Sequence, residues 1–358
     1  MTEKKPHPGN PKAHPKGLGT TPPAKPRWWR RPVLWLVLLL GLPLAAIGVH
    51  GALWYLATQQ IIDQTTAQLR ILGRQGWTTF ADAPVRAGYP WVAEVSIPGI
   101  RIAGPLLEWQ AERLVIRLAL FRPQTVRIAA EGKQAGRLGN APMAPFSAAR
   151  DEAIVDLTTP DVLNIALDGL QAATPTGPLA AETVRLRLDR ALLTLGLDIG
   201  NATLPGLPDG WPLGGRLDRL GVDVAVQGGL PADTSGPALK TWRDGGGRID
   251  LTRLALGWDK VKAAGQLQLS LDPLLQPNIA GQVRIGGFGG LIDALVATNL
   301  LAPRQAPVVR AVLGMLARPA EDTGPDSVDV PVTLRDRSLN VGRIPLLRLP
   351  EFVWPAGK

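Results

Sequence analysis

The chain has 358 residues, a net charge of +9, 45% hydrophobic residues and 5% aromatic residues. Its 40 Gly and 34 Pro residues suit many short strands joined by turns better than long helices. Cys is absent and the three His residues end at His50, which excludes disulfides, Cys or His zinc sites and His-dependent nucleophilic catalysis beyond that residue.

Residues 1–31 form a Pro- and Lys-rich tail with few apolar side chains. Eight basic residues and one acid give this tail +7 of the net charge of +9. A nucleic-acid-binding protein would carry its basic surplus on the folded part, so we expect no nucleic-acid partner. The composition predicts a disordered cytoplasmic tail.

Residues 32–57 are predicted to be a transmembrane anchor. Val33–Val49 carries no charge, and the apolar character resumes after His50 through Leu56. A spanning helix needs about 20 apolar residues, whereas the apolar core of a signal peptide has about 7–15. Trp and Tyr residues flank both ends, as at the two interfaces of a bilayer. A cleaved signal is the alternative, although no clear A-x-A site follows the run.

The basic tail before this anchor predicts its orientation. Positive charge is retained on the cytoplasmic side, which places the rest of the chain outside. We therefore expect a single-pass protein of a bacterial inner membrane with a periplasmic C-terminal domain.

Residues 58–76 are predicted to be an amphipathic helix that continues from the anchor and ends at Gly73 or Gly76. Ile61, Ile62 and Leu69 are among the residues that recur at helical spacing between polar ones. We expect this apolar side to pack on the following domain rather than on lipid.

The remainder, 77–358, is predicted to be a β-rich periplasmic domain, because apolar and polar residues alternate repeatedly. The clearest segments are 114–120, 184–188, 193–199, 222–226, 267–271 and 328–334. Such alternation is typical of antiparallel strands with one buried face. The fold class is mainly β (α+β), a meander-rich curved sheet or sandwich, whose apolar face needs a second sheet, helices or a ligand to cover it.

Two further patterns refine this prediction. Helical spacing at 288–301 and 306–317, with prolines between, predicts a late helical pair. Three segments, "AERLVIRLALF", "AETVRLRLDRALL" and "GRIDLTRLALGW", are similar to one another and hint at repeated strand units.

Few residues suggest chemistry. The chain contains no nucleophile elbow, Walker loop or zinc-protease motif. The acidic stretch 321–329 could offer Ca²⁺ ligands, but its spacing fits no EF-hand and is typical of a loop. A glycosidase-like pair of acids could be drawn from Asp151, Glu152, Asp161 and Asp168, which equally suit solvated strand faces. We therefore assign no catalytic, cofactor-binding or metal-binding residue and expect no cofactor.

Tryptophan is frequent beyond the anchor, at positions 77, 91, 109, 211, 242, 258 and 354. Trp77, Trp91, Trp109 and Trp258 are candidates for an apolar ligand groove. Packing in the core or at sheet edges is the alternative interpretation.

The order of features resembles a known bacterial family. Gly88-Tyr89-Pro90 precedes "LEWQAERLVIRLALFRPQTVRIA", and "GQLQLSLDPLLQPNIAGQVRIGGFGGLIDALV" comes before "VPVTLRDRSLNVGRIPLLRLP". In this order the chain is similar to the bacterial domain-of-unknown-function family numbered 2125 over nearly all of residues 30–350. The C-terminal part more distantly resembles AsmA-like envelope proteins, which implies an anchored, β-rich protein involved in lipid handling.

Two hypotheses of function remain open. The first is a non-enzymatic module that binds lipid, such as a phospholipid or a lipopolysaccharide precursor, or another apolar ligand. The second is a structural or scaffolding envelope protein with a closed core and no ligand. A carboxylate-dependent hydrolase is a third, weaker interpretation.

Overall fold

The computed structural model describes most of the chain in eight stretches. These are residues 30–104, 107–139, 141–207, 210–231, 233–299, 301–320, 323–342 and 344–354. The chain divides into two compact units, one up to Ala52 and one from Leu53 onward. The predicted tail 1–31 lies almost wholly outside the described residues.

The first described element is one continuous helix, α1 (Arg30–Arg74). It runs without a break through the predicted anchor and through residues 58–74 of the amphipathic segment predicted to reach residue 76. Within the described residues, one helix is long and apolar enough to cross a membrane, with a mean hydropathy of 2.2 in its most apolar window. This N-terminal helix has the length and composition of a membrane anchor or of a signal sequence.

The second unit is built mainly of strands. The first nine are β1 (Thr78–Phe80), β2 (Val85–Ala87), β3 (Val92–Ala103), β4 (Leu107–Ala119), β5 (Thr125–Leu138), β6 (Ala144–Ser147), β7 (Arg150–Asp156), β8 (Val162–Thr174) and β9 (Gly177–Asp189). The others are β10 (Thr194–Thr203), β11 (Arg216–Gln227), β12 (Arg248–Trp258), β13 (Val261–Leu271), β14 (Pro277–Gly286), β15 (Arg318–Ala320), β16 (Gly324–Arg335), β17 (Ser338–Val341) and β18 (Ile344–Arg348).

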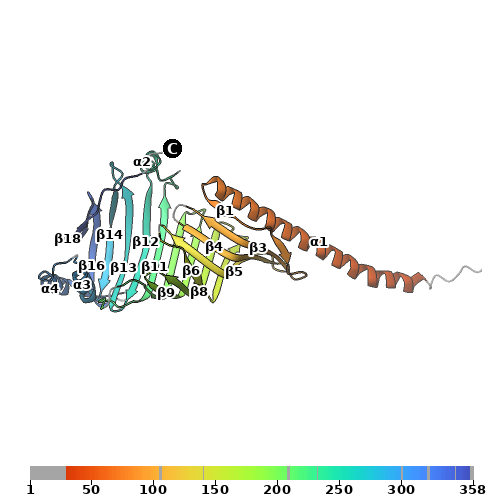
Figure 1. The fold of residues 1–358 in the computed structure, drawn as a ribbon, viewed down its shortest axis with the longest axis horizontal. Coiled ribbons are helices and arrows are strands. Elements are labelled where there is room, and N and C mark those ends of the chain that lie inside the picture. Colours follow the sequence, from red (N-terminus) through yellow and green to blue (C-terminus); the bar gives the residue numbers. More distant parts are fainter. Residues whose placement is uncertain are drawn as a thin grey trace, which may run out of the picture. The chain divides into compact units, whose positions relative to one another are not determined.

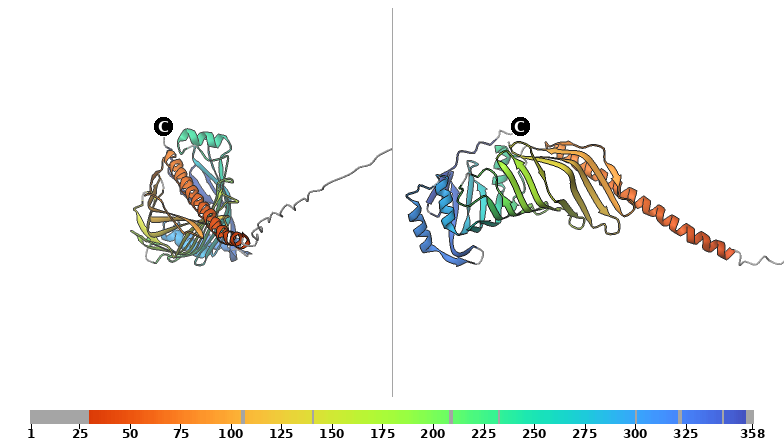
Figure 2. Two further views of the ribbon diagram at one scale, coloured as in Figure 1. Left: turned by 90° about the vertical axis from the view of Figure 1, so that its right-hand side faces the viewer. Right: turned by 60° about the horizontal axis from the view of Figure 1, so that its bottom comes forward.

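All these strands belong to one antiparallel sheet (Figures 1 and 2). The long strands pair in chain order, β3 with β4, β4 with β5, and each strand from β8 to β13 with the next one. β14 continues to β16, and the short β6 and β7 connect β5 to β8. The predicted mainly β, meander-rich fold is confirmed.

Within the stretches that the structure describes, three shorter helices interrupt the meander. The predicted late pair is confirmed as α3 (Phe288–Ala297) and α4 (Ala306–Leu316). α2 (Gly236–Asp244), between β11 and β12, was not predicted, although Ser235 caps its first turn and a proline occupies that turn. Trp242 anchors α2, since its indole nitrogen donates to the Gly229 carbonyl at 2.8 Å.

Two glutamates mark equivalent positions in two three-stranded units, β3–β5 and β8–β10. Glu112 of β4 lies between two glycines with positive φ on the neighbouring strands, and Glu182 of β9 lies between a glycine and an asparagine of the same kind. These four residues are Gly99 (φ 57°), Gly132 (φ 85°), Gly169 (φ 63°) and Asn201 (φ 49°). The weak similarity between the two segments that contain Glu112 and Glu182 therefore coincides with a repeated local structure.

The left-handed residues change which side chains face inward. Residues three apart in a regular strand lie on opposite faces. Ile97 and Ile100 flank Gly99, yet both are buried, and Val184 packs in the same cluster as Ala181. In each strand, the single residue with positive φ shifts the alternation by one position. The apolar side chains before it and after it therefore lie on the same face.

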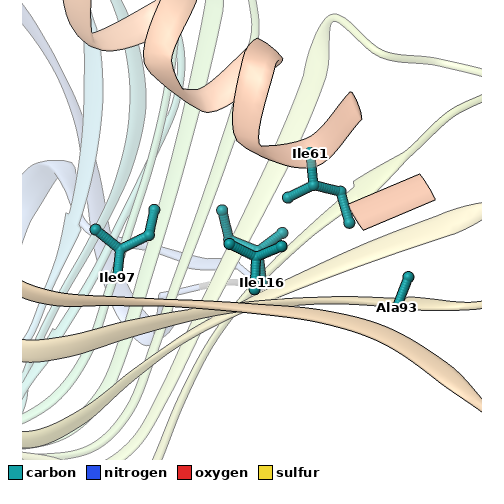
Figure 3. Packing of buried hydrophobic residues seen from close by; sticks show 5 residues of the cluster. Ile61, Ala93, Ile97 and Ile116 are labelled. Carbon is teal, nitrogen blue, oxygen red and sulfur yellow. The ribbon is translucent and has the colours of Figure 1, made fainter. Parts of the chain in front are cut away.

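The three-stranded unit β3–β5 is covered by the C-terminal half of α1. Ile61 packs on Ala93, Val95, Ile97 and Ile116, and all five are buried (Figure 3). The Trp54 indole nitrogen adds a hydrogen bond of 2.9 Å to the Val92 carbonyl. The family-like Gly88-Tyr89-Pro90 turn has a cis Tyr89–Pro90 bond, and the Tyr89 ring packs edge-on against Trp54.

We predict that Ile61→Ala loosens this helix from the sheet. Removing a buried isoleucine side chain costs about 2–5 kcal/mol. The free energy of unfolding, measured on the full chain by urea denaturation, should fall by that amount. Gln64→Ala, on the exposed side of α1, is the control and should change it by less than about 0.5 kcal/mol. Equal effects of the two substitutions would contradict the packing described.

Candidate functional site

Apolar side chains form two rows across one face of β8–β13, which we call the apolar face. The register aligns each residue of a row with the next across neighbouring strands. One row is Leu163, Leu188, Leu195, Val224, Leu251 and Leu267, and the other is Ile165, Leu186, Leu197, Val222 and Leu254. The strand period of two keeps charged neighbours on the opposite side.

The apolar face is only partly protected from solvent. Its side chains are half-buried, and Leu195 reaches 38% exposure. At the equivalent side of β3–β5, by contrast, Ala93 and Val95 are fully buried, because α1 covers them. The buried cluster that involves α1 extends over β3–β5, with no member from β8–β13 among the described residues.

The opposite face of the sheet is charged and internally paired. Arg117 bridges Glu94 and Glu131, each at 2.7 Å. Arg253 likewise bridges Asp223 at 2.6 Å and Asp198 at 2.8 Å. These hydrogen bonds raise the pKa of Arg253 and lower that of Asp198. The sheet therefore presents one charged and one apolar side.

Elements at both ends of the strands border the apolar face. At one end, the Gln276 side chain donates to the Phe352 carbonyl and accepts from its backbone N–H, which fixes the C-terminal segment to the β13–β14 turn. At the other end, α3 packs through Ala294 on Val261 and Leu213.

A polar group lies beside these rows, on β4, β5 and β7. Gln134 is buried, its amide donates to Asp151 at 2.7 Å, and its carbonyl oxygen accepts from the Trp109 indole at 3.2 Å. Burial raises the pKa of Asp151, and the hydrogen bond from Gln134 acts in the opposite direction. Gln134 also lines a depression of about 650 Å³ together with Phe146, Ala172 and Leu179.

The four tryptophans proposed for a ligand groove lie in different surroundings. Trp77 follows α1 and packs on Gly104, while Trp91 is exposed and contacts Phe121. Trp109 belongs to the polar group beside Gln134. Trp258 packs near Trp211 at the α3 end, where its indole donates to the Gly214 carbonyl.

The sequence names only these tryptophans as candidate groove residues, and it predicts the leucine and valine rows as part of an apolar sheet face that a second sheet, helices or a ligand must cover. The rows were visible as alternation, but a solvent-facing leucine and a core leucine have the same pattern.

Three of the four acidic candidates, Asp151, Glu152 and Asp168, lie on the paired strands β7 and β8, and two of them are held in ion pairs. Glu152 pairs with Arg127 and Arg150, and Asp168 pairs with Arg185. Asp161 is exposed at the turn before β8. In the stretch 321–329, Asp329 pairs with Arg284, whereas Glu321 and Asp322 lie outside the described residues. Across the part of the chain that the structure describes, no three His, Cys, Asp or Glu side chains gather in a metal-binding group.

These features define a β-rich protein with an N-terminal apolar helix and one extended antiparallel sheet that has an apolar and a charged side. The family model DUF2125, described as "Uncharacterized protein conserved in bacteria", matches residues 54–350. The chain therefore belongs to this bacterial family, as its sequence motifs suggested. No curated protein and no solved structure gives a match.

The raised pKa of Asp151 predicts a specific pH dependence of stability. The folded chain binds this proton more tightly than the unfolded chain, so stability should fall as pH rises from about 4, the ordinary aspartate value, through the raised pKa. Asp151→Asn should resemble wild type below this window and be more stable above it.

Urea denaturation at several pH values checks this prediction. Gln134→Leu serves as a second variant, since it removes the hydrogen bond that favours the ionised carboxylate and should steepen the loss. Parallel profiles for wild type and Asp151→Asn would contradict the assignment.

Proposed function

We propose that this protein is a non-enzymatic, membrane-anchored module of the bacterial envelope that holds the acyl chains of a lipid on its apolar face. The ligand class is phospholipid or lipopolysaccharide precursor. The domain from Leu53 onward would be periplasmic, with α1 as a single-pass anchor in the inner membrane.

The contrast between the two repeated units carries this proposal. In β3–β5 the apolar side is covered by Ile61 and its neighbours on α1, which bury Val95 and Ile97. In β8–β10 the rows around Leu186 and Leu197 have the same orientation but stay half-buried. An acyl chain could cover the rows of β8–β10 as the apolar side chains of α1 cover β3–β5.

The energetics also favour an apolar occupant. Covering apolar surface contributes roughly 25 cal/mol per Å². Contiguous apolar surface that stays accessible to solvent is a feature of interaction sites. Since both rows consist only of Leu, Ile and Val side chains, they offer nothing that would hold a polar substrate.

The N-terminal region supports the proposed location. The uncharged helix has the composition of a membrane span, and the basic residues before it favour an N-terminus in the cytoplasm.

The scaffolding alternative requires a closed core, and the half-buried rows argue against that requirement. A hydrolase would need two acids that face each other across a cleft. Of the four nominated acids, Glu152 and Asp168 are instead engaged by arginines, which favours a non-enzymatic role.

Site-specific photo-crosslinking tests the proposed ligand. A photoreactive amino acid replaces Leu267, on the apolar face, or its neighbour Gln266, on the charged side, in the full chain expressed in bacteria. We expect mass spectrometry to find lipid adducts at position 267, at least several times more abundant than at position 266. Equal yields at both positions, or adducts to protein only at 267, would refute the proposal.

The absence of native Cys gives a direct test of orientation. Leu192→Cys reports on the domain and Lys12→Cys on the tail. In cells with a permeabilised outer membrane, an impermeant maleimide should label position 192, and position 12 only after the inner membrane is also opened. Labelling in the reverse order would overturn the proposed topology.

A further inference from the structure

Helix α4 exposes a row of apolar side chains that its packing does not use. Val308, Val312, Met315 and Leu316 recur at helical spacing along one side, which we call the α4 flank. They are 64%, 46%, 85% and 58% exposed, respectively. A helix side in contact with water is normally polar.

The opposite side of α4 packs against α3. Val309 and Leu313 pack into a cluster around Ile292 and Leu301. The only charged residue within α4, Arg310, pairs with Asp293 of α3 at 2.7 Å. The α4 flank is therefore surplus to the core of this helical pair.

The charges around α4 bear on what could cover the flank. Arg304 before the helix and Arg318 after it are both exposed. Residues 302–320 include three arginines and no acid, and the acidic Glu321 and Asp322 that follow lie outside the described residues. A second copy packed by twofold symmetry would bring these like charges together, whereas anionic headgroups complement them.

We infer that the α4 flank docks on the surface of a lipid bilayer, with its aliphatic side chains at the boundary of the acyl chains and with Arg304 and Arg318 at the headgroups. Helices that combine an apolar side with basic residues bind membranes in this manner. The inference takes from the proposed function only that the chain is anchored in a membrane. It does not depend on a lipid held by the apolar face.

The flank can be probed in the full chain because the protein has no other cysteine. Met315→Cys is labelled with an environment-sensitive dye and reconstituted into vesicles of phosphatidylcholine and phosphatidylglycerol that contain a spin-labelled quencher lipid. Protein-free vesicles of the same composition are added, so that insertion into either bilayer is detected. Leu192→Cys, 69% exposed in the β9–β10 turn, is the matched control.

We expect a blue-shifted emission at position 315 and quenching at least three times that at position 192. Adding Val312→Glu to the labelled Met315→Cys chain should return the signal toward the control value. This substitution lies on an exposed position, and an unchanged circular dichroism spectrum would verify the fold. Vesicles without phosphatidylglycerol should give weaker quenching.

A water-like emission at position 315 in all vesicles would overturn the inference, as would quenching that Val312→Glu leaves unchanged. Self-association of the full chain that Val312→Glu abolishes, without lipid quenching, would assign the flank to a second copy. The crosslinking at Leu267 is read separately, so either proposal can fail without the other.

Discussion

The structure depends on one constraint: an antiparallel sheet with one apolar side must have that side shielded from water. Over β3–β5 the chain meets this requirement itself, since α1 places Ile61 against Val95 and Ile116. Beyond those strands the same side continues, but α1 does not extend over it. The apolar face is thus a part of this side on which no described α1 residue joins the buried cluster, and its side chains stay half-buried.

The residues with positive φ opposite Glu112 and Glu182 explain how these long strands keep their apolar side chains on one face of the sheet. In a regular strand, apolar residues three positions apart, such as Ile97 and Ile100, would lie on opposite faces. The left-handed residues beside Glu112 and Glu182 reset the alternation in both units. Hydrogen bonds made by these glutamates, to the Lys133 N–H and to the Asn201 side chain, tie the irregular residues to the central strand.

Sequence patterns predicted the strand content and the late helical pair, because period-two and helical spacing are strong over those segments. They failed at α2, which is short and has only a capping serine and a proline as signals. The tryptophan groove stays a prediction, and the structure places Trp91 beside Phe121 and Trp258 beside Trp211. The number of tryptophans in the sequence does not predict which of them are neighbours in space, because the distance between two residues of a sheet depends on the strand register.

The sequence by itself determined the apolar N-terminal helix, the alternating strands, the exclusion of His and Cys chemistry, and the family, because these depend on local composition and order. Only the tertiary structure decided which apolar rows are covered. Leu186 and Val95 have similar sequence surroundings, yet Val95 is buried beneath α1 and Leu186 is not. Burial is a property of what packs on a residue from elsewhere in the chain, which a local pattern does not contain.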